Sequence, residues 1–206
     1  MQENKEYKYY NEKPTWSHNY TFGTILSMLD KNVNKKIIDL GCGNGSLAHE
    51  LINRGFDVYG VDASVSGIEI AKKDFPERFF VCDLSSYELP KMLQNKNFDT
   101  VISTEIIEHL YNPHQYISFC KTLLNNNGEI ILSTPYHGYL KNLIISILNK
   151  WDNHHTALWV GGHIKFWSKR TIESLLNEFD FYITDFRGAG RLPFIWKSMI
   201  IKARLS

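Results

Sequence analysis

Residues 36–45, which read K-I-I-D-L-G-C-G-N-G, constrain the fold more than any other part of the chain. Two isoleucines lead into Asp39, three glycines follow within five positions, and a helical pattern begins at Ser46. Glycine is favoured where the backbone takes a positive φ or approaches a ligand closely, and the first turn of a helix offers unpaired N–H groups to that ligand. The segment therefore predicts a strand, a tight turn and a helix that together bind a nucleotide-like cofactor.

Strand-like and helical patterns alternate along most of the chain. We expect strands at Lys35–Leu40, Asp57–Asp62, Arg78–Leu84, Thr100–Ser103, Glu129–Ser133, Phe181–Arg187 and Ser198–Leu205. We expect helices at Trp16–Leu29, Ser46–Asn53 and Ser66–Lys73, one that Asn112 caps and the run N-N-N-G at 125–128 ends, and one from Ser168 to Phe179. The alternation predicts an α/β fold with a doubly wound, Rossmann-like sheet of seven mostly parallel strands. At 206 residues, the chain fits one domain, 1–206.

The chain is almost neutral, with a formal net charge of +1 and a pI near 7.7. This balance offers no electrostatic basis for binding a nucleic-acid backbone and favours a small or weakly charged ligand. The three cysteines show no C-x-x-C spacing, so we interpret Cys42, Cys82 and Cys120 as reduced packing residues. The N-terminus lacks a signal-peptide core and the longest apolar stretch, Leu143–Leu148, is too short to cross a bilayer, so we expect a cytoplasmic location without a membrane span.

The alternation is interrupted between residues 136 and 167, after the fifth expected strand. A helical pattern at Leu140–Leu148 precedes a loop rich in aromatic residues and histidines. Ligands lie over the carboxyl ends of the strands in sheets of this kind, and the loops there control access to them. We therefore expect residues 136–167 to be an insertion that covers an acceptor site. We expect residues 1–30 to form an N-terminal helical cover in which residues 1–13 are frayed.

Four acidic residues follow or end the first four expected strands: Asp39, Asp62, Asp83 and Glu105. Several converging carboxylates would repel the pyrophosphate of a dinucleotide but would suit a cationic ligand that carries a ribose. The glycine turn also departs from the dinucleotide pattern G-x-G-x-x-G, because its third glycine comes one place early. These observations favour S-adenosylmethionine over NAD as the cofactor.

Five segments in order resemble the successive motifs of class I S-adenosylmethionine-dependent methyltransferases. They are I-I-D-L-G-C-G-N-G, V-D-A-S, F-V-C-D-L, F-D-T-V-I-S-T-E-I-I-E-H-L and L-L-N-N-N-G-E-I-I-L-S-T-P, and they cover residues 36–135. The segments E-I-I-E-H-L and S-T-P, with a later H-x-x-F-x-S from His163 to Ser168, resemble the ubiquinone-biosynthesis O-methyltransferases and related small-molecule enzymes. The resemblance implies S-adenosylmethionine as cofactor.

The resemblance also implies a role for individual residues of the cofactor site. It places the turn along the methionine moiety, with Asp39 acting on the amino group, and this turn consists of Gly41, Cys42, Gly43, Asn44 and Gly45. Asp62 would bind the ribose hydroxyls beside Ala63, and Asp83 would meet the adenine amine beside Leu84. Thr104, Glu105 and Ile106 would form the floor beneath the sulfonium.

Several of these residues also have an ordinary structural interpretation. Asp62 could cap the following helix, Asp83 could cap a turn, and Glu105 could be a helix-start acid favoured by the helix dipole. Glu108 is interpreted as a solvated residue of that helix start. The aromatic residues of the insertion either line an apolar pocket or anchor the insertion to the domain.

Three histidines are candidates for catalysis: His137, His109 and His163. His137 follows S-T-P-Y, close to the expected acceptor opening, and could act as a general base. His109 could equally be a structural residue of a short helix. His154, His155 and His163 with Asp152 match no closed zinc pattern, so no metal is expected.

The sequence therefore predicts a methyltransferase for a small-molecule acceptor of aromatic or apolar character, with O-methylation by direct in-line transfer. No nucleic-acid partner is expected, and the sequence leaves the oligomeric state open. One alternative is a non-catalytic subunit that binds S-adenosylmethionine. A second alternative, an NAD-dependent oxidoreductase, is opposed by the glycine spacing and by the four acids.

Overall fold

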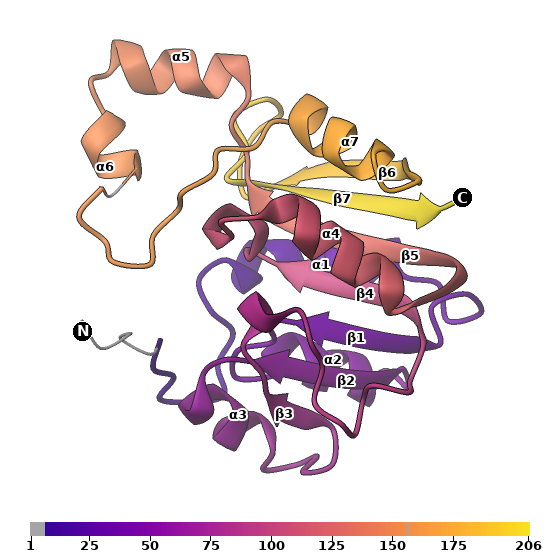
Figure 1. The fold of residues 1–206 in the computed structure, drawn as a ribbon. Coiled ribbons are helices and arrows are strands. Elements are labelled where there is room, and N and C mark those ends of the chain that lie inside the picture. The colour runs from indigo at the N-terminus through magenta and orange to yellow at the C-terminus, as the bar shows by residue number, and fades with distance from the viewer. Residues whose placement is uncertain (1–6, 156) are drawn as a thin grey trace.

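One sheet of seven strands runs through the computed structural model, which describes residues 7–155 and 157–206. The strand order is β3-β2-β1-β4-β5-β7-β6. Strands β1 to β5 are parallel to one another, whereas β7 is antiparallel to both β5 and β6. The strands are β1 (Lys36–Leu40), β2 (Asp57–Asp62), β3 (Phe79–Val81), β4 (Phe98–Thr104), β5 (Leu124–Pro135), β6 (Phe181–Ala189) and β7 (Ser198–Leu205). The predicted doubly wound, mostly parallel sheet is confirmed (Figure 1).

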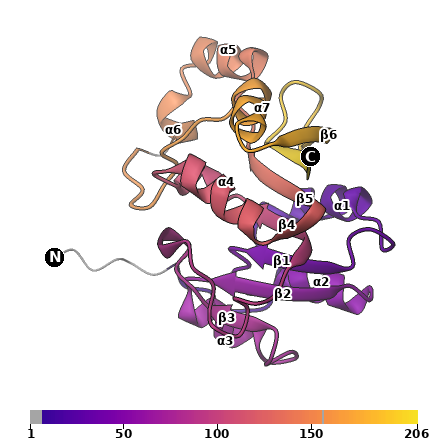
Figure 2. The same ribbon diagram turned by 45° about the vertical axis from the view of Figure 1, so that its right-hand side comes forward.

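Helices cover both faces of this sheet (Figure 2). Apolar side chains of α1 (His18–Met28), α2 (Ser46–Asn53) and α3 (Val65–Ala71) share one buried cluster with one face. Those of α4 (Pro113–Thr122) and α7 (Lys169–Asn177) share a second cluster with the other. The short helices η1 (Leu84–Ser86) and η2 (Ile107–His109) follow β3 and β4. Cys42, Cys82 and Cys120 are buried and unpaired, as expected for packing residues.

The largest differences from the predicted elements concern strands three to five. Strand β3 ends at Val81, because Asp83 leaves the strand to cap η1 with a side chain that accepts from the Ser85 N–H. Strand β5 begins at Leu124, which pairs with Phe98, and the register then shifts before the pairing of Glu129 with Thr100. The run N-N-N-G at 125–128 is therefore an irregular stretch within β5, and α4 ends before it at Thr122.

The insertion after β5 contains two helices, of which only the first was expected. They are α5 (Tyr139–Ile147) and α6 (Trp151–His155), and both stand away from the sheet beyond the carboxyl ends of its parallel strands (Figure 1). Several of the large apolar side chains in the insertion are exposed, among them Ile147 at 72% and Leu158 at 98%. Among the described residues, no helix combines the length and apolar character needed to cross a membrane.

A buried ionic network lies near the amino end of β1, at the end of the parallel strands opposite to the glycine turn. Glu129 is 0% exposed, and its carboxylate lies 2.8 Å from Lys202 Nζ and 2.7 Å from Arg204 Nη2. Asn34 Nδ2 donates to the same carboxylate at 2.6 Å and to Thr100 Oγ1 at 2.7 Å. The network thus joins β4, β5 and β7 far from the glycine turn.

Candidate functional site

The glycine turn between β1 and α2 has the backbone conformation that its sequence requires. Gly41, Gly43 and Gly45 have φ values of 81°, 56° and 77°, all in the left-handed region that side chains disfavour. The N–H groups of Gly41 and Cys42 both donate to the carbonyl oxygen of Val61, which ties the turn to β2. The side chain of Ile106 occupies the space where a Cβ on Gly41 would lie.

Asp39 is a buried acid near the end of β1, two residues before the first glycine of this turn. Its side chain is 1% exposed, and Oδ1 has no hydrogen-bond partner among the described residues. Burial, together with the neighbouring Asp62 carboxylate, raises the pKa of Asp39 from 3.8 to about 7. An unpaired buried carboxyl is costly in a chain without a ligand, and a bound ammonium group would offset that cost.

Asp62 connects the glycine turn to the turn after β2. Its Oδ2 accepts from the Gly43 N–H at 2.8 Å and its Oδ1 from the Ser64 N–H at 2.7 Å. Ser64, not Asp62, caps α3 by accepting from the Gly67 N–H at 3.1 Å. Asp62 therefore holds the backbone of the site in place, and its predicted contact with a ribose, beside the exposed Ala63, stays a prediction.

Residues 7–13 lie against the glycine turn, so the prediction that they are frayed is wrong for this part of the N-terminus. The backbone N–H of Tyr9 donates to Ser66 Oγ at 3.1 Å, and its ring lies against Gly43 and Gly67. Asn44 Nδ2 donates to the carbonyl oxygens of Asn11 and Lys13 at 2.8 and 2.9 Å. The Asn44 amide thus fixes this segment over the turn, and residues 1–6 of the expected cover lie outside the described residues.

The third predicted acid, Asp83, is exposed and lies at the carboxyl end of the edge strand β3. Its Oδ1 accepts from the Ser85 N–H at 2.9 Å, which is the turn-capping role that the sequence left open. Leu84, next to it, is buried in the core. A contact of either residue with adenine remains a prediction.

The residues after β4 adopt a strained turn beside the glycine turn. Glu105 has a φ of 55°, its N–H donates to the Ser133 carbonyl oxygen at 3.0 Å, and its Oε1 accepts from Ser133 Oγ at 2.8 Å. Burial raises the pKa of Glu105. Thr104 is buried, and Ile106 packs on Gly41. This position beside the turn agrees with the floor that the resemblance implies, although the ligand contacts themselves are untested.

His18 is a site residue that the sequence did not reveal. It is 7% exposed and connects three elements, because its Nδ1 lies 3.1 Å from Ser46 Oγ and its Nε2 lies 3.3 Å from Thr104 Oγ1. Burial lowers the pKa of His18 to about 4, so the ring is neutral at pH 7. A histidine at the start of an amphipathic helix carries no sequence signal for such a role.

The three catalytic candidates fall into two groups. His109 and His163 lie together with a centroid distance of 4.9 Å, beside Glu108. His137 lies with His154 and His155 at centroid distances of 5.6 and 5.7 Å. Burial, with Lys141 nearby, lowers the pKa of His137 to about 3.

The interpretation of Glu108 as a solvated residue is wrong. Its side chain is 1% exposed and accepts from Thr134 Oγ1 at 3.0 Å. The short helix η2 turns this residue inward, toward β5, instead of outward to solvent. Burial and then the Glu105 charge raise the pKa of Glu108 well above 4.5.

Comparison with known proteins identifies the family. A model of the methyltransferase domain family matches residues 16–185, which is most of the chain. The chain belongs to the methyltransferase domain family. This membership confirms the predicted family, and with it the expected class of cofactor, S-adenosylmethionine.

Relatives in this methyltransferase family carry the name that the sequence motifs suggested. A ubiquinone biosynthesis O-methyltransferase of Histophilus somni is 32% identical over 121 residues, covering 54% of this chain and 51% of the relative. One of Rickettsia akari is 28% identical over 174 residues, covering 82% of this chain and 68% of the relative. The chain spans about half the length of the first such relatives.

Solved structures support the same fold. A magnesium protoporphyrin IX methyltransferase of Synechocystis, determined with bound SAH, has a TM-score of 0.68 at 23% identity, covering 90% of this chain and 82% of that one. The PH0226 protein of Pyrococcus horikoshii has a TM-score of 0.68 at 22% identity, covering 96% and 95%. At this level of identity the likeness shows the methyltransferase fold alone.

Binding of S-adenosylmethionine should weaken as the pH falls below 7. Asp39 becomes protonated in this range, and in the predicted contact a neutral acid would no longer attract the cofactor's amino group. Where binding requires the ionised form, Kd rises about tenfold for each pH unit below the pKa. Calorimetric titrations of the wild type between about pH 5.5 and 7.5 would measure this slope.

Asp39→Asn provides the matched control, since its side chain stays neutral throughout this range. We expect this variant to bind weakly and with little dependence on pH. If the wild type showed the same flat profile, Asp39 would not be the group that holds the cofactor's amino group.

Proposed function

We propose that this methyltransferase transfers the methyl group of S-adenosylmethionine to a hydroxyl of a small-molecule acceptor of aromatic or apolar character. The observation that carries the proposal is the buried Asp39 carboxyl, whose Oδ1 has no hydrogen-bond partner among the described residues, next to a left-handed glycine turn in a chain whose relatives are named O-methyltransferases. A sulfonium methyl is already activated, so no covalent catalyst is required. The main tasks of the protein are to align the acceptor oxygen behind the methyl carbon and to exclude water.

In this proposal, two segments close the site. The described part of the N-terminal segment, residues 7–30, forms one cover, which is supported by the contacts of residues 7–13 with the glycine turn and of His18 with Thr104. Within the insertion 136–167, the described residues form the acceptor cover. Their exposed side chains include Leu143, Ile144, Trp151, Trp159 and Phe166, which could face an apolar acceptor. Exclusion of water by such covers strengthens electrostatic interactions within the site.

The acceptor hydroxyl must lose its proton during the transfer. In our proposal, His137, His109 and His163 act at the acceptor, with His137 as the base. At a pKa of about 3, His137 is neutral at pH 7 and has a free lone pair, although a base of this pKa provides little driving force. Its two neighbours His154 and His155, and Phe166 at a centroid distance of 5.1 Å, would fix the ring.

The test is a methyl-transfer assay with labelled S-adenosylmethionine and a panel of simple phenols and catechols. We expect label in at least one acceptor. We expect His137→Asn to leave the cofactor Kd unchanged while it lowers kcat by roughly two powers of ten, the lower end of the general-base range. Unchanged kcat on an accepted substrate would exclude His137 as the base.

Binding assays with the same protein distinguish the alternatives. Calorimetry that shows S-adenosylmethionine binding without transfer to any acceptor would favour the non-catalytic subunit. Binding of NAD in its place would favour the oxidoreductase, which the family match opposes. We also propose a cytoplasmic location, which a localisation experiment would test.

A further inference from the structure

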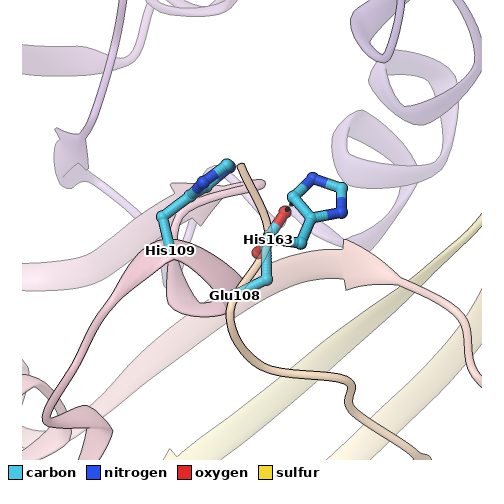
Figure 3. A group of neighbouring side chains, drawn as sticks. All are labelled: Glu108, His109 and His163. Carbon is cyan, nitrogen blue, oxygen red and sulfur yellow. Dashed lines mark ion pairs between the residues drawn. The ribbon is translucent and has the colours of Figure 1, made fainter. Parts of the chain in front are cut away.

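Three potential metal ligands from two distant segments lie together at the end of η2 (Figure 3). Glu108 and His109 belong to η2, and His163 comes from the returning end of the insertion. One ligand atom of each lies within 4.8 Å of the other two, and no other group of three meets this condition among residues 7–155 and 157–206. The fold thus brings together residues that are more than 50 positions apart.

The Glu108 carboxylate has one oxygen paired and one free. Thr134 Oγ1 donates to Oε2 at 3.0 Å, whereas Oε1 is buried without a hydrogen-bond partner. This free oxygen lies 3.9 Å from His163 Nε2. A buried carboxylate oxygen without a partner costs stability unless a cation or a donor reaches it. The unpaired atom is therefore directed toward the other two candidate ligands.

Main-chain contacts orient the His109 ring and hold the His163 segment in place. His109 Nδ1 lies 2.8 Å from the Gly161 carbonyl oxygen, so this nitrogen donates and Nε2 keeps the free lone pair. A ligating histidine in proteins is commonly held by such a second hydrogen bond. The Glu108 carbonyl oxygen accepts from the N–H groups of Ile164 and Lys165 at 2.9 and 3.0 Å, which holds the segment of His163 beside Glu108.

We propose that Glu108, His109 and His163 bind a divalent transition-metal ion such as Zn²⁺ or Mn²⁺. Two imidazole nitrogens and one carboxylate oxygen suit this class of ion better than they suit Ca²⁺ or Mg²⁺. The 3.9 Å between Glu108 and His163 is close to the roughly 3.3 Å that separates two ligands of a tetrahedral zinc ion. The proposal departs from the sequence-based expectation of no metal, which considered His163 with Asp152, His154 and His155 instead.

Three protein ligands leave at least one coordination position open. The site lies between the strained turn at Glu105 and the insertion, on the side where the acceptor would enter. A role of the open position in holding the acceptor's oxygen rests on the proposed function, whereas metal binding itself does not.

The experiment measures binding of Zn²⁺ and Mn²⁺, each alone, to metal-free protein by equilibrium dialysis, without cofactor or acceptor. We expect one ion per chain in the wild type. Glu108→Gln keeps the shape of the side chain and an acceptor for Thr134 but removes the charge, and His163→Asn removes one ligand. Each change should weaken binding by at least roughly tenfold to a hundredfold, the range seen even for outer-shell partners.

A matched control uses another histidine that lies close to a glutamate. His114 Nε2 lies 3.2 Å from Glu178, but no third ligand joins this pair among the residues that the structure describes. His114→Asn should therefore bind the ion as the wild type does. Circular dichroism of each variant would verify that the fold is retained.

Two results would overturn the proposal: a wild type that binds neither ion, or Glu108→Gln and His163→Asn variants that bind like the wild type. Calorimetry with S-adenosylmethionine on the same proteins tests the proposed function separately. Retained metal binding without cofactor binding would refute the proposed function and leave the metal site standing. Cofactor binding without metal binding would refute the metal site and leave the proposed function standing.

Discussion

Gly43→Val should abolish measurable binding of S-adenosylmethionine while the chain stays folded. Gly43 has a φ of 56°, which a β-branched residue can hardly adopt, and a Cβ at this position would meet the Tyr9 hydroxyl. The left-handed conformation alone costs about 1–2 kcal/mol with a side chain. Relief of this strain and of the clash must move the turn, whose Gly43 N–H is bound to Asp62. We expect a loss of at least roughly a hundredfold in affinity, measured by calorimetry.

Gly55→Val is the matched control for this experiment. Gly55 also has a positive φ, at 90°, but it lies after α2, and among the described residues only Lys31 Nζ would come within 4 Å of an added Cβ. Its replacement should lower stability through backbone strain and leave cofactor affinity unchanged. Normal binding by Gly43→Val would show that the cofactor does not depend on this turn.

Glu129→Gln should lower the free energy of unfolding by about 3 kcal/mol, the lower end of the range for removing one partner of a buried ion pair. Lys202 is only 13% exposed and would lose the carboxylate that lies 2.8 Å away. Urea denaturation at pH 7 would measure the loss. Glu50→Gln is the control, because Glu50 forms an exposed pair with Arg54, and such pairs contribute less than about 1 kcal/mol.

The effect of Glu129→Gln should depend on pH with a defined sign. Burial alone would raise the pKa of Glu129, but hydrogen bonds from Lys202, Asn34 and Arg204 outweigh it and hold the pKa below 4.5. A carboxyl whose pKa is lower in the folded state contributes its full stability at a pH above its pKa in the unfolded chain. It loses that contribution as the pH falls through its pKa in the folded protein. The difference between wild type and variant should therefore shrink below about pH 4. A difference that grows at acidic pH would contradict this account.

The sheet could be predicted from the sequence because its strands are short apolar runs between turn signals. Lys36–Leu40 and Asp57–Asp62 agree with the expected strands to within one residue. The glycine turn marks the end of the first strand, and Asp62 marks the end of the second. The run N-N-N-G at 125–128 misled the prediction of β5. Its residues are typical of turns, but pairing of Leu124 with Phe98 draws them into an irregular strand.

The site was only partly predictable, because several of its contacts join residues that are far apart in the chain. The glycine turn is a local feature, and the left-handed conformations of its three glycines agree with the prediction. The position of Tyr9 against Gly43 depends on packing between the N-terminal segment and α3, through Ser66 and Gly67. The burial of Glu108 depends on the insertion returning over η2, and no periodicity in the sequence reports that path.

Backbone hydrogen bonds join the insertion to the domain at both of its ends. The N–H of Tyr136 donates to the Lys197 carbonyl oxygen at its start, the His137 N–H donates to the Trp167 carbonyl oxygen, and the N–H groups of Ile164 and Lys165 donate to Glu108 at its end. Backbone hydrogen bonds form whatever side chains the residues carry. The exposed side chains of α5 and α6 can therefore diverge during evolution without disturbing the sheet or the glycine turn, whereas the buried Lys141, which donates to the Lys197 carbonyl oxygen, is constrained. If the insertion covers the acceptor as proposed, changes in this one segment would alter acceptor choice and leave the cofactor site unchanged.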